Sequence, residues 1–211
     1  MMALARGRFI TLEGGEGVGK STQVRALADR LRATGLTVLE TREPGGSAGA
    51  EAIRELLLHR EADAWTPAAE ALLFAAARSD HVSRLIRPAL DQGNWVICDR
   101  FIDSSRAYQA SGPELTDADI LALHKVGSGG LMPDRTLLLQ LPPKKIAERR
   151  AARKLDRPDR FEDRQDDFHE GVSDAFNRFA DIEPSRICRV DADGAAERVT
   201  DRLVHALADL L

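Results

Sequence analysis

Short apolar segments alternate with longer amphipathic segments along this 211-residue chain. The apolar segments are rich in Val, Ile and Leu, a composition typical of strands that are buried on both faces of a sheet. They predict five strands, over residues 9–12, 36–40, 94–98, 135–140 and 186–190. Between them, apolar residues recur at helical spacing. This pattern predicts helices over residues 21–34, 48–58, 67–90, 117–127, 143–154, 161–180 and 195–211.

The alternation of strands and helices predicts the architecture. Strands that are joined by helical crossovers run parallel, and the right-handed crossovers place helices on both faces of the sheet. We therefore expect a three-layer α/β fold around a five-stranded parallel sheet. The chain has no repeat and no Pro/Gly-rich linker, and its length suits one sizeable core, so residues 1–211 are predicted to form a single domain.

Composition excludes several classes of protein. Hydrophobic residues make up 43% of the chain and charged residues 30%, which is ordinary for a globular protein. A net charge of −4 argues against a nucleic-acid polymer as partner. No apolar run approaches the ~20 residues of a membrane span. Cys98 and Cys188 lack metal-binding spacing and indicate thiols in a reducing compartment, so we expect a cytoplasmic protein.

The most specific motif is Gly-Gly-Glu-Gly-Val-Gly-Lys-Ser-Thr over residues 14–22, a full match to the P-loop pattern. Its glycines let backbone N–H groups curl around an anion. Lys20 adds a positive charge for the β- and γ-phosphates, and the Ser21 hydroxyl can ligate Mg²⁺. The preceding strand and following helix place the phosphates at a helix N-terminus. The predicted nucleotide-binding residues are Gly14, Gly15, Glu16, Gly17, Val18, Gly19, Lys20, Ser21 and Thr22.

Polar residues also follow two other predicted strands. Asp99 and Arg100 come directly after 94–98, and ligands of open parallel sheets bind beyond the carboxyl ends of the strands. Asp99 is therefore a candidate Mg²⁺ ligand and Arg100 a candidate phosphate ligand, with a simple Asp–Arg ion pair as the structural alternative. Arg42-Glu43-Pro44-Gly-Gly follows 36–40, where glycines allow a ligand to approach the backbone closely, although such turns are common.

Two further groups have the chemistry to bind a nucleoside. Phe74 and Arg78 share one helix face, so the ring could stack on a base while the guanidinium donates to base oxygens. The alternative is a core phenylalanine and a surface arginine. Ser105, Tyr108 and Gln109 have near-helical spacing, and they either bind a polar substrate or cap a helix.

Residues 144–164 carry nine Lys/Arg against five Asp/Glu. The arginine-rich part has no continuous apolar stripe and contains Pro158, so it predicts a lid over about 149–164. Arg149 and Arg153 lie on one helical face, and an arginine supplied in this way stabilises the charge on a migrating phosphoryl group. The alternative is a solvated run of charges.

Taken in order, these motifs resemble those of bacterial thymidylate kinases from residue 9 to about 193. The shared stretches include Arg-Glu-Pro-Gly-Gly (42–46), Leu-Leu-Phe-Ala-Ala-Ala-Arg (72–78), Asp-Arg-Phe (99–101) and Asp-Arg-Phe-Glu (159–162). The resemblance implies a P-loop NTPase fold and transfer of the ATP γ-phosphate to dTMP with Mg²⁺, giving dTDP. It also implies a homodimer, for which the helix 67–90 could supply the interface unless it is buried within the monomer.

The resemblance further assigns individual residues. The implied dTMP-binding residues are Glu16, Arg42, Glu43, Phe74, Arg78, Arg100, Ser105, Tyr108 and Gln109. Phe74 would stack on thymine, with Arg78 and Ser105 at its polar edge, and Arg100 would hold the dTMP phosphate. Tyr108 would pack against the deoxyribose, and Glu16 would reach the 3′-hydroxyl.

The implied catalytic residues are Lys20, Asp99, Arg149 and Arg153, with Ser21 and Asp99 at the metal. No basic residue precedes Lys20 in the loop, so the chain resembles the family members whose catalytic arginine comes from the lid. Asp80 departs from the family, which usually has an amide there. The alternatives are a kinase of another nucleoside monophosphate or of a deoxynucleoside and, more remotely, a regulatory ATPase switch.

Overall fold

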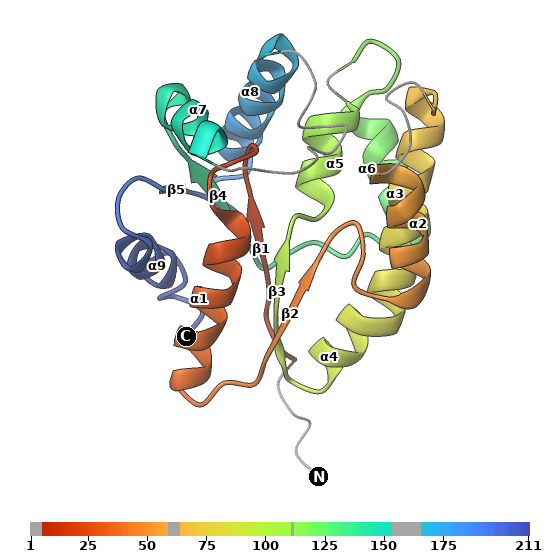
Figure 1. The fold of residues 1–211 in the computed structure, drawn as a ribbon. Helices are drawn as coiled ribbons and strands as arrows, with labels where there is room; N and C mark the ends of the chain where they lie inside the picture. The colour runs from red at the N-terminus through yellow and green to blue at the C-terminus, as the bar shows by residue number, and fades with distance from the viewer. Residues whose placement is uncertain (1–5, 59–63, 111, 153–165) are drawn as a thin grey trace.

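Five parallel strands form one sheet in the order β2-β3-β1-β4-β5 (Figure 1). The structure is a computed structural model that describes residues 6–58, 64–110, 112–152 and 166–211. The strands are β1 (Phe9–Glu13), β2 (Val38–Arg42), β3 (Trp95–Asp99), β4 (Arg135–Gln140) and β5 (Ile187–Asp191). The predicted five-stranded parallel sheet is confirmed, because all four strand pairings are parallel.

The helices lie close to the predicted ranges, except for α5, which had no predicted counterpart. They are α1 (Lys20–Ala33), α2 (Ala48–Leu58), α3 (Pro67–His81), α4 (Arg87–Asp91), α5 (Ile102–Gln109), α6 (Asp117–Ser128), α7 (Pro143–Ala152), α8 (Asp166–Ile182) and α9 (Ala196–His205). The helix expected over 67–90 is α3 and α4 joined by a π-helical turn over Val82–Ile86. The helix expected over 195–211 stops at His205.

Helices cover both faces of the sheet (Figure 1). On one face, Leu12 and Leu137 pack with Leu27 of α1 and Leu203 of α9. On the other, the strands pack against α3, α4, α5, α6 and α8. Successive side chains of a strand point to opposite faces, so strands covered on both sides need apolar residues throughout. This explains the continuous apolar runs in the sequence.

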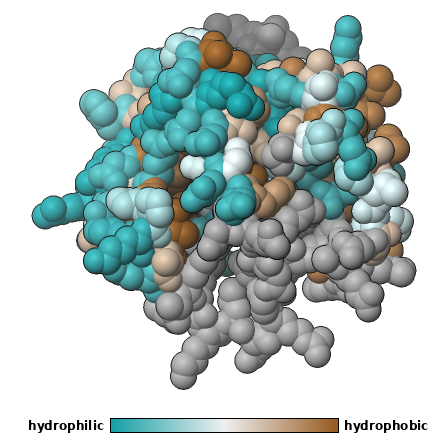
Figure 2. All heavy atoms as spheres, turned by 90° about the horizontal axis from the view of Figure 1, so that it is seen from above, coloured by the Kyte–Doolittle hydropathy of each residue, from teal (hydrophilic) through white to brown (hydrophobic). Residues whose placement is uncertain are grey.

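The carboxyl ends of the strands share one edge of the sheet, where the P-loop and the loops after β2 and β3 meet. Figure 2 views the molecule from above this edge, and hydrophilic residues dominate the described surface. No helix among the described residues is long and apolar enough to cross a membrane.

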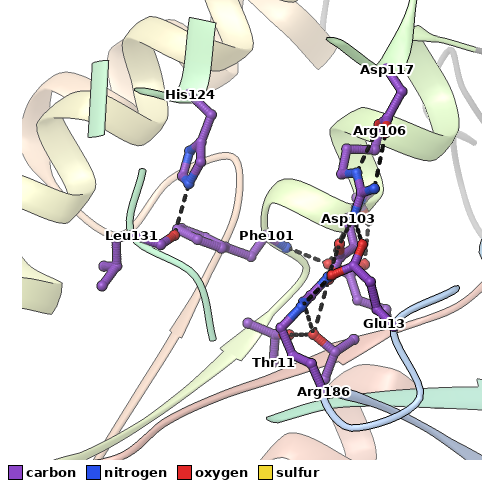
Figure 3. A network of polar contacts seen from close by, with 12 residues as sticks. Thr11, Glu13, Phe101, Asp103, Arg106, Asp117, His124, Leu131 and Arg186 are labelled. Carbon is purple, nitrogen blue, oxygen red and sulfur yellow. Dashed lines mark hydrogen bonds and ion pairs between the residues drawn. The ribbon is translucent and has the colours of Figure 1, made fainter. Parts of the chain in front are cut away.

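A buried polar network holds α5 beside this edge (Figure 3). Arg186 donates to the two carboxylate oxygens of Asp103 at 2.6 and 2.8 Å, and Thr136 donates at 2.9 Å. Arg106 lies between Asp103, at 3.0 Å, and Asp117, at 2.7 and 3.0 Å. Burial raises the pKa of Asp103, but the hydrogen bonds and charges of the arginines outweigh it and leave the pKa below its usual value. The network therefore fixes α5 against β4, α6 and the start of β5.

Candidate active site

The P-loop has the backbone conformation that its glycines allow. Gly14, Gly17 and Gly19 have φ angles of 134°, 79° and 100°, in the region that favours glycine. A Cβ at Gly14 would also lie 2.5 Å from the carbonyl oxygen of Leu139. Lys20 is the first residue of α1, and its Nζ donates to the carbonyls of Gly14 at 3.2 Å and Gly15 at 2.8 Å. The ammonium group therefore lies over the mouth of the loop.

Ser21 and Asp99 stand together beside the loop. The Ser21 hydroxyl donates to Asp99 Oδ2 at 2.6 Å, although the two residues come from α1 and the end of β3. A hydroxyl and a carboxylate are oxygen donors of the kind that Mg²⁺ takes together with phosphate oxygens and water. The described residues contain no cluster of three or more His, Cys, Asp or Glu suited to a metal. An ion held here would therefore draw its other ligands from the nucleotide and water.

Arg100 does not form the alternative ion pair with Asp99 and pairs with Glu16 instead. It also donates to Ser104 Oγ at 2.9 Å and to Tyr108 Oη at 3.2 Å, with its guanidinium 5.0 Å from the Tyr108 ring centre. Its φ of 66° is left-handed, which costs a non-glycine residue about 1–2 kcal/mol. The surrounding contacts thus hold Arg100 in a conformation that it would not adopt alone.

Arg78 is buried rather than on the surface. Its side chain is 3% exposed, and Nε donates to Glu43 Oε2 at 2.7 Å while Nη2 donates to Ser105 Oγ at 2.9 Å. The other oxygen of Glu43 lies 3.0 Å from His81 Nδ1. His81 therefore has a structural role next to the site. These contacts rule out the solvent-facing alternative for Arg78.

The side chains converge on a cavity of about 210 Å³. All nine residues predicted to bind the acceptor line it, and Lys20, Ser21 and Asp99 line the same cavity. Pro44, Arg54, Leu58, Phe101 and Ser104 also line the cavity and were not predicted. Arg54 had no sequence signal, since α2 reads as an ordinary amphipathic helix, whereas Ser104 stands next to the predicted Ser105.

The glycines after β2 have close neighbours in the protein itself. A Cβ at Gly45 would lie 2.6 Å from Glu51 Oε1, and one at Gly46 would lie 2.4 Å from His81 Nε2. The protein's own side chains thus fill the space beside these glycines, and close approach of a ligand to their backbone stays a prediction. Glu51 also pairs with Arg42 and accepts from the Gly46 N–H at 2.8 Å.

Asp80, the departure from the family pattern, holds two helices together. It accepts from Ser47 Oγ at 2.6 Å, just before α2, and from Arg84 Nε at 2.6 Å. A Cβ at Gly49 would lie 2.7 Å from Asp80 Oδ2, so glycine allows this close contact. Asp80 thus anchors the start of α2 on α3.

Arg149 alone of the two predicted lid arginines lies within the described residues. It belongs to α7, and it donates to the carbonyls of Val18 at 3.0 Å and Ala192 at 3.1 Å. Its Nη1 would lie 3.5 Å from a Cβ at Gly19. Arg153 and most of the predicted lid, 149–164, lie outside the described residues. The structure therefore brings Arg149 against the P-loop.

Glu13 is a buried carboxyl group close to this cavity. Burial, reinforced by the charge of Asp103, raises its pKa from 4.5 to about 7. Folding thus favours the protonated form, so the stabilisation is complete below the unfolded-state pKa and is lost as pH rises through the folded-state pKa. We expect Glu13→Gln, which stays neutral, to gain stability relative to the wild type between about pH 5 and 7.5. Urea unfolding of both proteins across this range measures the difference in their free energies of unfolding. A difference that does not change with pH would contradict the raised pKa of Glu13.

The cavity is lined by the P-loop and by Arg100, whose guanidinium contacts the loop by donating to the Gly14 carbonyl at 3.2 Å and by pairing with Glu16. Cations for the phosphates of two ligands thus line one cavity, which is the arrangement of a P-loop kinase of small nucleotides. The comparison with known families then gives its place within that class. Residues 12–203 match the thymidylate kinase family, and the chain belongs to this family.

Individual relatives agree over nearly the whole length. The chain is 60% identical to a thymidylate kinase of Rhizorhabdus wittichii, over 97% of this chain and 99% of that protein. It is 49% identical to one of Caulobacter vibrioides, over 93% and 94% of the two chains. The crystal structure of thymidylate kinase from Ehrlichia chaffeensis is similar, with a TM-score of 0.75 and 30% identity over 96% of this chain and 99% of that one.

Proposed function

We propose that this member of the thymidylate kinase family transfers the γ-phosphoryl group of ATP to dTMP, giving dTDP and ADP. The observation that supports this most strongly is the shared cavity. Acceptor candidates from the P-loop, the loop after β2, α3 and α5 converge there on Lys20, Ser21 and Asp99. Acceptor and donor phosphates could therefore lie side by side, and proximity alone accounts for a large part of the acceleration in such reactions.

The proposed roles of the dTMP-binding residues follow from the chemistry of the side chains that line the cavity. Phe74 is proposed to stack on thymine and Arg78 to donate to a base oxygen, while Tyr108 packs against the sugar. The doubly charged dTMP phosphate is a stronger partner for Arg100 than the Glu16 carboxylate, so we propose that it displaces Glu16 from the guanidinium. The Glu16 carboxylate would then accept from the 3′-hydroxyl of the sugar.

The residues proposed to bind ATP act by neutralising the charge of its phosphates. Lys20 is proposed to bind the β- and γ-phosphates, and Arg149 or Arg153 to bind the migrating phosphoryl group. Ser21 and Asp99 would hold Mg²⁺, which supplies positive charge to the phosphate oxygens when it is bound. The protein residues thus orient two anions and offset their repulsion without covalent chemistry.

The direct test measures turnover with dTMP, dUMP, dCMP, dGMP and AMP as acceptors in the presence of ATP and Mg²⁺. The proposal expects the highest kcat/KM with dTMP. A higher value with another monophosphate would favour the alternative kinase. ADP formation that does not depend on any acceptor would favour a regulatory ATPase.

Arg78→Ala is expected to raise KM for dTMP by about tenfold to a hundredfold, because a charged hydrogen bond to the base is worth about 1.5–3 kcal/mol. The effect on kcat should be smaller, since Arg78 is proposed to bind the base and not the migrating group. Steady-state kinetics with dTMP and ATP varied in turn give the two constants. Arg84→Ala, a 71% exposed arginine on the same helical run, is the matched control and should change neither KM. An unchanged KM for dTMP in Arg78→Ala would contradict the base-binding role.

We also propose a homodimer that forms through α3 and α6. Leu72 on α3 is 55% exposed and Val126 on α6 is 89% exposed, and these two helices pack against each other. Sedimentation velocity of Leu72→Glu beside the wild type tests this interface.

A cytoplasmic location is proposed as well, because Cys98 and Cys188 are both free.

A further inference from the structure

Helix α5 begins without a capping side chain of its own. Its N-cap is Phe101, which offers no side-chain hydrogen bond, so the first N–H groups of the helix need another acceptor. Glu13, at the end of β1, supplies it from a different element. The carboxylate accepts from the Phe101 N–H at 2.8 Å, the Ser104 N–H at 3.3 Å and the Ser104 hydroxyl at 2.5 Å.

A carboxylate at the position of Glu13 would be destabilised if these hydrogen bonds did not form. The residue is 0% exposed, and Figure 3 shows it beside Asp103, a second buried carboxylate. Burying an anion near a like charge costs several kcal/mol if hydrogen bonds do not offset it. The start of a helix is one of the few places where backbone N–H groups and the helix dipole stabilise an anion. The hydrogen bonds from Phe101 and Ser104 therefore offset part of the cost of burying Glu13, although its pKa stays raised.

The end of α5 that Glu13 holds is also the end that orients Arg100. Arg100 immediately precedes Phe101 and has the left-handed φ of 66°. Its Nη1 donates to Ser104 Oγ at 2.9 Å, so the Ser104 hydroxyl links Arg100 to Glu13. The Phe101 N–H, fixed by Glu13, belongs to the peptide that follows the left-handed turn. Both the backbone and the guanidinium of Arg100 are thus tied to one carboxylate.

We propose that Glu13 is a positioning residue for the acceptor site, which fixes the Arg100 turn and the start of α5 so that Arg100 meets the acceptor phosphate. The proposal rests on the proposed function, since it takes dTMP as the acceptor. Glu13 does not line the cavity, so its effect passes through Phe101 and Ser104, which it contacts, and through Arg100 beside them. A shift of about 1 Å in such a contact is enough to lose much of its effect.

The experiment compares Glu13→Met and Glu13→Gln with the wild type in steady-state kinetics. Methionine is similar in size but accepts none of the three hydrogen bonds well, so KM for dTMP should rise at least about tenfold. Glutamine can still accept from both N–H groups and can donate to Ser104 Oγ, so its KM for dTMP should stay within about threefold. KM for ATP should stay within about twofold in both variants, because the P-loop contacts are intact.

Thr200→Val is the matched control for a buried hydrogen bond. Thr200 is 3% exposed and donates to Gln23 at 2.8 Å between α9 and α1, away from the cavity. This variant should lose stability without changing either KM. If Glu13→Met does not fold, Ser104→Ala removes the side-chain link alone and should raise KM for dTMP about threefold to tenfold.

The outcomes distinguish the positioning role of Glu13 from the proposed function. The positioning role would be overturned if KM for dTMP were unchanged in Glu13→Met, or if KM for dTMP and KM for ATP rose equally, while the wild type still phosphorylates dTMP. Absence of dTMP-dependent turnover in the wild type would overturn the proposed function itself. A dTMP-selective rise in Glu13→Met that Glu13→Gln largely avoids would support the positioning role.

Discussion

Lys20→Ala is expected to lower kcat by about three orders of magnitude, the largest effect of a single substitution in this chain together with that of Arg149. The Lys20 ammonium group lies over the P-loop mouth, where two neutral carbonyls accept its hydrogen bonds. A triphosphate would replace these weak partners with charged ones. Charge stabilisation of a phosphoryl transition state in a site that excludes water is worth several kcal/mol per cation, and each 1.36 kcal/mol changes the rate tenfold.

The substitution should lower kcat and the affinity for ATP, and it should leave the affinity for dTMP almost unchanged. Burial lowers the pKa of Lys20, with a further contribution from the charge of Arg100, so removing the amine should not cost the fold much stability. Thermal unfolding of Lys20→Ala should therefore stay close to that of the wild type, which shows that the loss is catalytic. Lys125→Ala, an exposed lysine on α6, is the control. A kcat within tenfold of the wild type in Lys20→Ala would contradict the phosphate role.

The strands could be predicted from the sequence because each is covered on both faces and therefore continuously apolar. The segment 135–140 shows this most clearly, since the predicted and observed strands have the same bounds. Helix α5 was not among the predicted helices, although the spacing of Ser105, Tyr108 and Gln109 pointed to one. Seven of its eight residues are buried, and most of these are polar, so no apolar stripe marks its periodicity. A helix enclosed on nearly all sides has no amphipathic signal to detect.

The candidate site could be predicted only where its chemistry is local in the chain. The P-loop and Asp99–Arg100 are such motifs, since their order and spacing carry the information. In the sequence, Glu13 reads only as the residue that follows a predicted apolar strand, and its partner Ser104 lies 91 residues further along. The contact of His81 with Glu43 likewise spans 38 residues. Such contacts arise when strand ends are brought together, so a single sequence does not contain them.

Arg149→Ala is expected to lower kcat by about a thousandfold, with KM for dTMP little changed. Arg149 already lies on the P-loop, where its guanidinium donates to the Val18 and Ala192 carbonyls. A γ-phosphate is a stronger acceptor than either carbonyl, so a small movement would bring the guanidinium onto the nucleotide. An arginine supplied in this way contributes about 10³–10⁵ to the rate in related phosphoryl transfers. Arg149→Lys keeps the charge without the planar fork, and we expect it to recover only part of the activity.

Arg153→Ala decides whether Arg149 acts alone. Arg153 follows Arg149 by four residues, so a continued helix would place the two on one face. If Arg149 carries the catalytic charge, Arg153→Ala should retain kcat within about tenfold, whereas a thousandfold loss would assign the role to Arg153. Single-turnover quench measurements with ATP and dTMP separate the chemical step from product release in both variants. Full kcat in both variants would show that the lid supplies no catalytic arginine, and the transition-state charge would then rest on Lys20, Arg100 and the metal ion.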